Sequence, residues 1–131
     1  MSLNDRRLSE FVEAHHYFEL RAGLRPNLAS GTKAEIPFHA APDGAAVIEL
    51  SDGRYAYVSN SEVTQGRGGV YAMYFDPNGN ADDYKQLLSG TTRNCSGGTT
   101  PWNTYVSCEE TGRGQVSTLE YFPVQTRPSL Y

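Results

Sequence analysis

The chain has little of what a membrane span or a nucleic-acid partner requires. Its longest uninterrupted apolar run is the six residues Val70 to Phe75, whereas a helix that crosses a bilayer needs about 20. Eleven basic residues stand against fifteen acidic ones, which gives a net charge of −4, and no long block of one sign occurs. We therefore expect no transmembrane segment and no nucleic-acid partner.

Cysteine is equally scarce, since Cys95 and Cys108 are the only two in the chain. Two cysteines allow one disulfide, two free thiols or a thiolate metal ligand. Spacing alone favours a disulfide that closes a short loop. No CxxC or HxxxH pattern accompanies them, so the sequence does not indicate a zinc site.

The N-terminal stretch lacks the compact apolar segment of a secretory signal.

Aromatic residues and glycine are abundant, with nine Tyr, five Phe and thirteen Gly among 131 residues. This composition predicts a mostly β protein with glycine-rich turns. Asp52-Gly53 and the stretch Asp76 to Asn80 are typical of hairpin turns. The segments with the length and composition of strands are residues 45–50, 54–60, 68–76, 84–90, 103–109 and 115–122.

Residues 1–43 are expected to form a separate N-terminal part. Leu8, Phe11, Val12 and His15 recur at helical spacing, which predicts a short amphipathic helix. Residues 22–43 are rich in proline, glycine and small residues, which indicates an irregular connector.

An internal repeat runs through the remainder of the chain. The sequence YVSNSE (57–62) returns as YVSCEE (105–110) at an offset of 48, and GRGGV (66–70) returns as GRGQV (112–116) at an offset of 46. A period just under 50 residues with about four short strands is typical of a β-propeller blade. A β-sandwich with two similar hairpins is the alternative.

We therefore predict a partial β-propeller over residues 44–131, with two repeats at about 44–90 and 91–131. Two blades of an open propeller would leave apolar side chains uncovered, because a propeller protects its blades by closing the circle. Further blades or partner protein chains are expected to cover them. The side chains concerned are Val70, Tyr71, Met73, Phe75, Leu119 and Phe122.

Each copy of the repeat ends its YVS strand on a glutamate, Glu62 or Glu110. Equivalent strand ends of successive blades lie around one axis, so these two carboxylates would converge and repel unless a cation lay between them. Solvated strand ends are the alternative. Cys95 suits either a soft ligand beside such carboxylates or one half of a disulfide. Gly97-Gly98 is predicted to form a bend, and Trp102 is predicted to pack.

The segment NCSGGTTPWNTYVSCEE (94–110) closely resembles the N-C-x-G-G-x-T-P-W-G-T-x-x-x-C-E-E signature of the PhoX-type alkaline phosphatase family. Upstream, DGRYAYVSNSE and GGVYAMYFDPNG are similar to the stretch ending in N-H-E and the following Gly-Gly-Val strand of that family. The resemblance covers about residues 41–123. It implies a β-propeller phosphomonoesterase with an iron (Fe3+) and calcium (Ca2+) cluster, exported to the periplasm or the exterior.

The resemblance also implies roles for individual residues. Cys95 corresponds to the thiolate that bridges irons, which would exclude a bond to Cys108. Glu62 and Glu110 correspond to metal ligands, and Glu109 is a less certain one. Phosphate monoesters are the implied substrates, and hydrolysis would be metal-assisted without a side-chain nucleophile.

The chain departs from the family in three respects. Ser61 stands where the family has His, and Asn103 where it has Gly. Family members run to several hundred residues, so we expect this chain to hold only part of the site, and an active enzyme would require the complete site. The alternative function is a non-catalytic structural or interaction subunit of a larger assembly.

Overall fold

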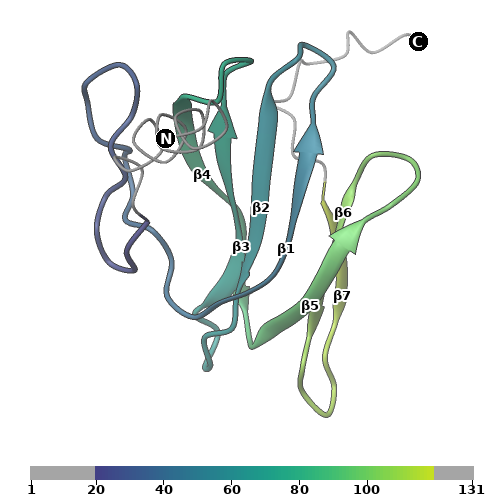
Figure 1. Cartoon of the computed structure of the whole chain (residues 1–131). Helices are drawn as coiled ribbons and strands as arrows, with labels where there is room; N and C mark the ends of the chain where they lie inside the picture. The colour runs from purple at the N-terminus through teal and green to yellow at the C-terminus, as the bar shows by residue number, and fades with distance from the viewer. Residues whose placement is uncertain (1–19, 120–131) are drawn as a thin grey trace, which may run out of the picture.

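The computed structural model describes residues 20–119, which form seven β-strands in two antiparallel sheets (Figure 1). The predicted mostly β class is therefore confirmed. The predicted N-terminal helix lies outside the described residues. No helix in residues 20–119 is long and apolar enough to cross a membrane. The strands are β1 (Pro42–Glu49), β2 (Tyr55–Ser61), β3 (Gly68–Phe75), β4 (Ala81–Thr91), β5 (Asn94–Thr99), β6 (Tyr105–Glu109) and β7 (Val116–Leu119).

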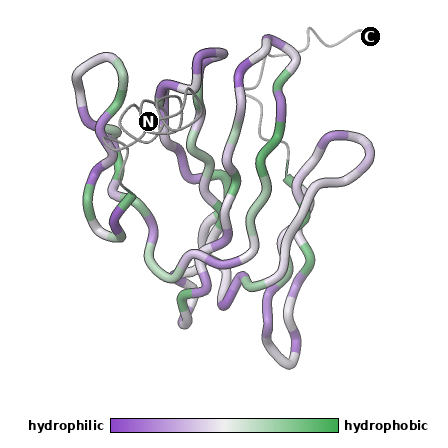
Figure 2. Tube along the Cα trace, viewed as in Figure 1, coloured by the Kyte–Doolittle hydropathy of each residue, from purple (hydrophilic) through white to green (hydrophobic). Residues whose placement is uncertain are grey.

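The first sheet is a meander in the order β1-β2-β3-β4, and both predicted hairpin turns are confirmed. Gly53 turns between β1 and β2 with φ of 80°, a backbone conformation that glycine adopts without steric cost. The turn from β3 to β4 is held by Asp76, whose Oδ1 accepts the amide protons of Asn78 and Asn80 at 2.9 Å each. Figure 2 shows hydrophilic residues gathered at these hairpin ends.

The second sheet has the order β5-β6-β7, and its first strand was not predicted. The Ser, Gly and Thr residues of β5 are typical of a turn, which is why a bend was predicted at Gly97-Gly98. That prediction is wrong. Both glycines lie within the strand, paired with Ser107 and Val106. Pairing to β6 and close packing against β1 therefore override the weak strand propensity of β5.

The hairpins β1-β2 and β5-β6 share the same construction. A register irregularity separates the pairs Pro42↔Ser61 and Ala45↔Ser59 in the first, and Asn94↔Glu109 and Gly97↔Ser107 in the second. These pairs lie at corresponding positions of the sequence repeat. The first hairpin has two more residue pairs next to its turn than the second hairpin. Corresponding residues of the first strands, such as Pro42 and Asn94, are therefore 52 residues apart, whereas those of the second strands, such as Ser61 and Glu109, are 48 apart.

The first sheet is covered on both faces. One face packs against the second sheet, and Tyr105 of β6 joins the buried cluster there. The other face packs against the irregular connector, the blue segment beside the sheet in Figure 1. Because Phe38 and Ala34 cover it, Met73 is fully buried. The first buried cluster consists of Ile48, Leu50, Ala56, Val58, Val70, Ala72, Tyr74 and Tyr105.

Several expectations about exposure are therefore wrong. Val70 and Met73 were expected to face water, yet both have 0% of their surface exposed. Tyr71, Phe75 and Leu119 are half-buried, and Phe122 lies outside the described residues. Trp102 was expected to pack, but it is 71% exposed in the turn between β5 and β6. The second sheet covers Val70, and the connector, which has no sequence periodicity, covers Met73.

His39 fastens the connector to the first sheet. Its Nδ1 accepts the hydroxyl proton of Tyr84 at 2.8 Å, and its backbone N–H donates to the same oxygen at 3.1 Å. Nε2 lies 3.1 Å from the carbonyl oxygen of Asn60, which can only accept, so Nε2 carries the proton. The imidazole ring stacks on the ring of Tyr71, with the two ring centroids 4.7 Å apart. Burial lowers the pKa of His39 from 6.5 to about 4, and its hydrogen bond to the Asn60 carbonyl opposes this only in part.

This arrangement predicts acid-sensitive stability. The pKa of His39 is lower in the folded chain, so the unfolded chain binds the extra proton first as pH falls. The stabilisation is complete above pH 6.5 and is lost progressively toward pH 4. We expect the free energy of unfolding, measured with urea, to fall by up to about 3 kcal/mol over this range because of His39. His39→Gln should flatten the profile, and identical pH slopes for both proteins would refute the assignment.

Candidate functional site

Three potential ligand side chains meet at one end of the two sheets. Asp43 near the start of β1, Glu62 after the end of β2 and Cys95 near the start of β5 place their ligand atoms within 4.8 Å of one another. Figure 1 shows these three strand ends at the same end of the molecule. Asp43 is exposed and the other two are half-buried, so the cluster opens to solvent.

The two matching irregularities of the hairpins put Asp43 and Cys95 in place. Asp43 lies between Pro42 and Ala45, and Cys95 lies between Asn94 and Gly97. A bulge breaks the alternation of a strand and redirects a side chain. Cys95 and Asp43 are thus counterparts in the two hairpins, 52 residues apart, whereas Glu62 and Glu110 are 48 apart. Asp43 was not predicted as a ligand, because the recognised repeat covers the strands that end on glutamate and not the strands that precede them.

Gly44 lets the two hairpins approach each other. A Cβ added to it would lie 2.5 Å from the carbonyl oxygen of Cys95 and 2.8 Å from the backbone nitrogen of Gly97. Both neighbours are backbone atoms of β5, which cannot rotate away. Only glycine at position 44 therefore permits the contact that brings Asp43 to Cys95.

A buried chain of hydrogen bonds fixes the backbone around Cys95. The side-chain amide of Asn60 on β2 donates to the carbonyl oxygens of Cys95 at 2.9 Å and Ser96 at 3.0 Å. Its Oδ1 accepts from Ser107 at 2.9 Å. Ser107 accepts in turn from the amide of Asn94 at 2.8 Å. Asn60, Asn94 and Ser107 are almost completely buried, so these bonds form away from competing water.

Arg93 connects Glu110 to the cluster. Its Nη2 donates to Glu110 Oε2 at 2.7 Å and lies 3.4 Å from Glu62 Oε1. Its backbone carbonyl accepts from the Glu110 N–H at 2.9 Å, and its own N–H donates to Val63 at 2.9 Å. Of the predicted ligands, Glu62 and Cys95 therefore lie in the cluster, and Glu110 lies beside it.

Glu109 has a different environment from Glu110. Its Oε1 accepts the backbone N–H of Thr92 at 2.6 Å and its Oε2 accepts that of Gln115 at 2.9 Å. The hydrogen bonds from Gln115 and Thr92 hold the pKa of Glu109 below its ordinary value. Both carboxylate oxygens are engaged in joining the segments around β6, which favours Glu110 over Glu109 as a ligand.

The thiol of Cys95 sits in a negative environment. A hydrogen bond with the Asp43 side chain raises its pKa, together with loss of solvation and the negative charges of Asp43, Glu110 and Glu62. A cation among these groups would act in the opposite direction. Both cysteines are free, so the disulfide that their spacing favoured is not formed.

The two residues at which the chain departs from the family, Ser61 and Asn103, are compatible with the local structure. Asn103 has φ of 66° in the β5-β6 turn, matching Gly53 at 80° in the β1-β2 turn. Asparagine tolerates this left-handed conformation better than most residues, so the turn persists. Ser61 is buried and donates to the carbonyl oxygen of Ala40 at 2.8 Å, which ties the connector to the end of β2.

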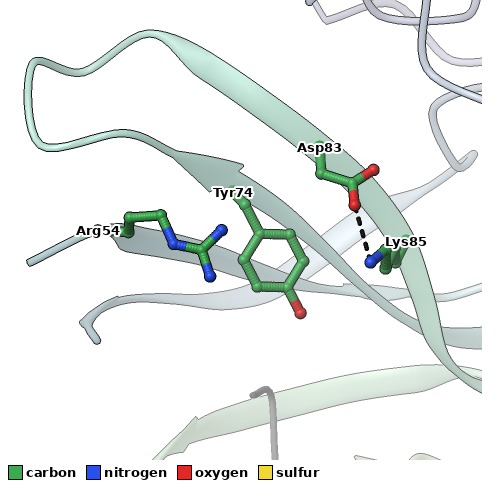
Figure 3. A pocket seen from close by; sticks show the side chains of 4 residues that line it. All are labelled: Arg54, Tyr74, Asp83 and Lys85. Atoms are coloured by element: carbon green, nitrogen blue, oxygen red, sulfur yellow. Dashed lines mark ion pairs between the residues drawn. The ribbon is translucent and has the colours of Figure 1, made fainter. Parts of the chain in front are cut away.

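A depression lies on the first sheet, lined by Arg54, Tyr74, Asp83 and Lys85 (Figure 3). Lys85 pairs with Asp83 at 2.8 Å. Arg54 pairs with Asp52 at 2.8 Å and Asp82 at 3.0 Å. Both cations of this depression pair with carboxylates, and it does not adjoin the cluster of Asp43, Glu62 and Cys95, so we assign no site to it.

The close approach at Gly44 gives a testable contrast with Gly98. An added Cβ at Gly98 meets nothing within 4 Å, whereas at Gly44 it meets the backbone of β5. We expect Gly44→Ala to cost about 1 to 3 kcal/mol of unfolding free energy, as overpacking does. Gly98→Ala should change it by less than about 1 kcal/mol. Urea unfolding measures both, and equal effects of the two substitutions would contradict the proposed contact.

One family model matches the chain, that described as "Alkaline phosphatase PhoX", and the match covers residues 9–128. No curated protein and no solved structure matches it.

Proposed function

The chain belongs to the PhoX alkaline phosphatase family, and on that premise we propose that it forms part of a metal-dependent phosphomonoesterase. Its metal centre would use Asp43, Glu62, Cys95 and Glu110. The observation that carries the proposal is the convergence of the first three within 4.8 Å from separate strands.

The donor set fits a mixed cluster. Carboxylate oxygens suit hard cations such as calcium, whereas a thiolate suits iron and other softer transition metals. We propose that Cys95 binds iron (Fe3+) and that the carboxylates bind both iron and calcium (Ca2+). The charge supports this, because Asp43, Glu62 and Glu110 provide three carboxylates and Arg93 is the one described cation paired with them.

When bound, such cations supply Lewis acidity that offsets the charge on a phosphate ester. The protein's contribution is positioning. The bulges direct Asp43 and Cys95 to one point, and Asn60 holds the backbone of Cys95 through two hydrogen bonds. Preorganised ligands of this kind avoid a reorganisation cost during the reaction. No side-chain nucleophile is assigned.

We further propose that residues 44–131 form two propeller blades that pack with further blades or partner chains, and that the protein is exported. The alternative, a non-catalytic subunit, is less favoured, because the family match spans most of the chain and the ligand side chains have converged.

The two cysteines allow a matched test of the metal centre. In protein loaded with iron and calcium, we expect Cys95→Ser and Glu62→Gln to lower iron binding at least about tenfold, and to lower the turnover of a chromogenic phosphate monoester by a similar factor in protein that holds the complete site. Cys108→Ser removes the other half-buried thiol and should leave both unchanged. Elemental analysis and a steady-state assay measure the effects. Wild-type protein that binds neither metal, or equal effects of the two cysteine substitutions, would refute the proposed centre.

A further inference from the structure

Arg93 lies beside the candidate centre, and residues 20–119 leave most of its hydrogen-bonding capacity unused. Its guanidinium carries five N–H donors, and its ion pairs with Glu62 and Glu110 both use Nη2. No described residue accepts a hydrogen bond from Nε or Nη1. The side chain is 43% exposed, so these donors can reach a ligand from solvent.

The backbone of Arg93 is held firmly. Its φ of 54° is unusual for a residue with a side chain, and its N–H and carbonyl are bonded to Val63 and Glu110. The next residue, Asn94, is buried in the hydrogen-bond chain that leads to Asn60. The guanidinium is therefore carried by a fixed segment at the edge of the cluster.

The counterpart of Arg93 in the other hairpin shows that this backbone does not require an arginine. Ala41 has φ of 47°, precedes β1 as Arg93 precedes β5, and accepts the N–H of Glu62 at 2.8 Å. Arg93 accepts the N–H of Glu110 in the same way at 2.9 Å. Alanine therefore supports the same backbone conformation and the same hydrogen bond. The backbone does not explain why position 93 carries a guanidinium beside the candidate centre.

We infer that Arg93 contacts the phosphate group of the substrate through Nη1–H, an inference that rests on the proposed function. Glu62 and Glu110 hold the guanidinium through Nη2, the nitrogen that both of its two-pronged edges share, so one N–H of each edge remains for a ligand. A charge-assisted hydrogen bond from Nη1–H to a phosphate oxygen is stronger than one between neutral groups. The ligand class is a phosphate monoester dianion, and inorganic phosphate serves as the probe.

The test uses the full chain loaded with iron and calcium, and titration calorimetry with inorganic phosphate. Arg93→Gln should weaken phosphate binding at least about tenfold, and in protein that holds the complete site it should raise KM for a chromogenic phosphate monoester by a similar factor. Arg93→Lys keeps the charge but places its donor differently, and its phosphate affinity should fall between. Bound metal, measured by elemental analysis, should be unchanged in both variants.

Arg67 provides the matched control. It is exposed in the β2-β3 turn, where the neighbouring Gly66 N–H donates to Thr92, the residue before Arg93. Arg67→Gln removes the same charge close by and should alter neither phosphate affinity nor KM.

The outcomes separate this inference from the proposed function. Active wild-type protein with an Arg93→Gln variant of unchanged phosphate affinity and KM would overturn only the role of Arg93. Loss of metal from both Arg93 variants, with normal phosphate affinity in the fraction that remains loaded, would also overturn it and assign Arg93 to the ion pairs alone. Wild-type protein that binds neither iron nor calcium refutes the proposed function, and metal-loaded wild-type protein that binds no phosphate overturns the inference.

Discussion

The arrangement of residues 20–119 depends on the hydrogen bonds of Asn60. Its side chain donates to the carbonyl oxygens of Cys95 and Ser96 and accepts from Ser107, which joins the two sheets. Its backbone carbonyl accepts from His39, which joins the connector. Asn60 is fully buried, so each bond that failed to form would leave a polar group without water or partner. Asn60 thus holds the first sheet, the second sheet and the connector in position relative to one another.

This constraint turns two similar hairpins into one site. Each hairpin has a bulge near the start of its first strand and a glutamate at or after the end of its second. What differs is the side chains that the shared backbone carries: Asp43 against Cys95, and Ala41 against Arg93. Because the two hairpins share a backbone geometry but carry different side chains, the centre combines the hard carboxylate of Asp43, the soft thiol of Cys95 and the positive charge of Arg93. Its function follows from the difference between the copies as much as from their likeness.

The sequence predicted those parts of the structure that depend on local chemistry. Aromatic and β-branched segments became strands, Asp52-Gly53 became a turn, and the family resemblance is confirmed by the match over residues 9–128. It could not predict features that depend on contacts distant in sequence. The strand β5 forms from Gly, Ser and Thr because β1 and β6 hold it. Met73 is buried by a connector without periodicity, and Asp43 reaches Cys95 only after the hairpins pack.

The most direct test of the account is cobalt titration of Asn60→Leu, because a thiolate bound to Co2+ absorbs at characteristic wavelengths and reports ligation by Cys95. Leucine has a similar shape but cannot donate to Cys95 and Ser96. The account predicts that the substitution lowers the free energy of unfolding by about 2 to 4 kcal/mol and weakens or abolishes the thiolate band under conditions in which the chain remains folded. A folded Asn60→Leu protein with wild-type stability and a wild-type thiolate band would contradict it.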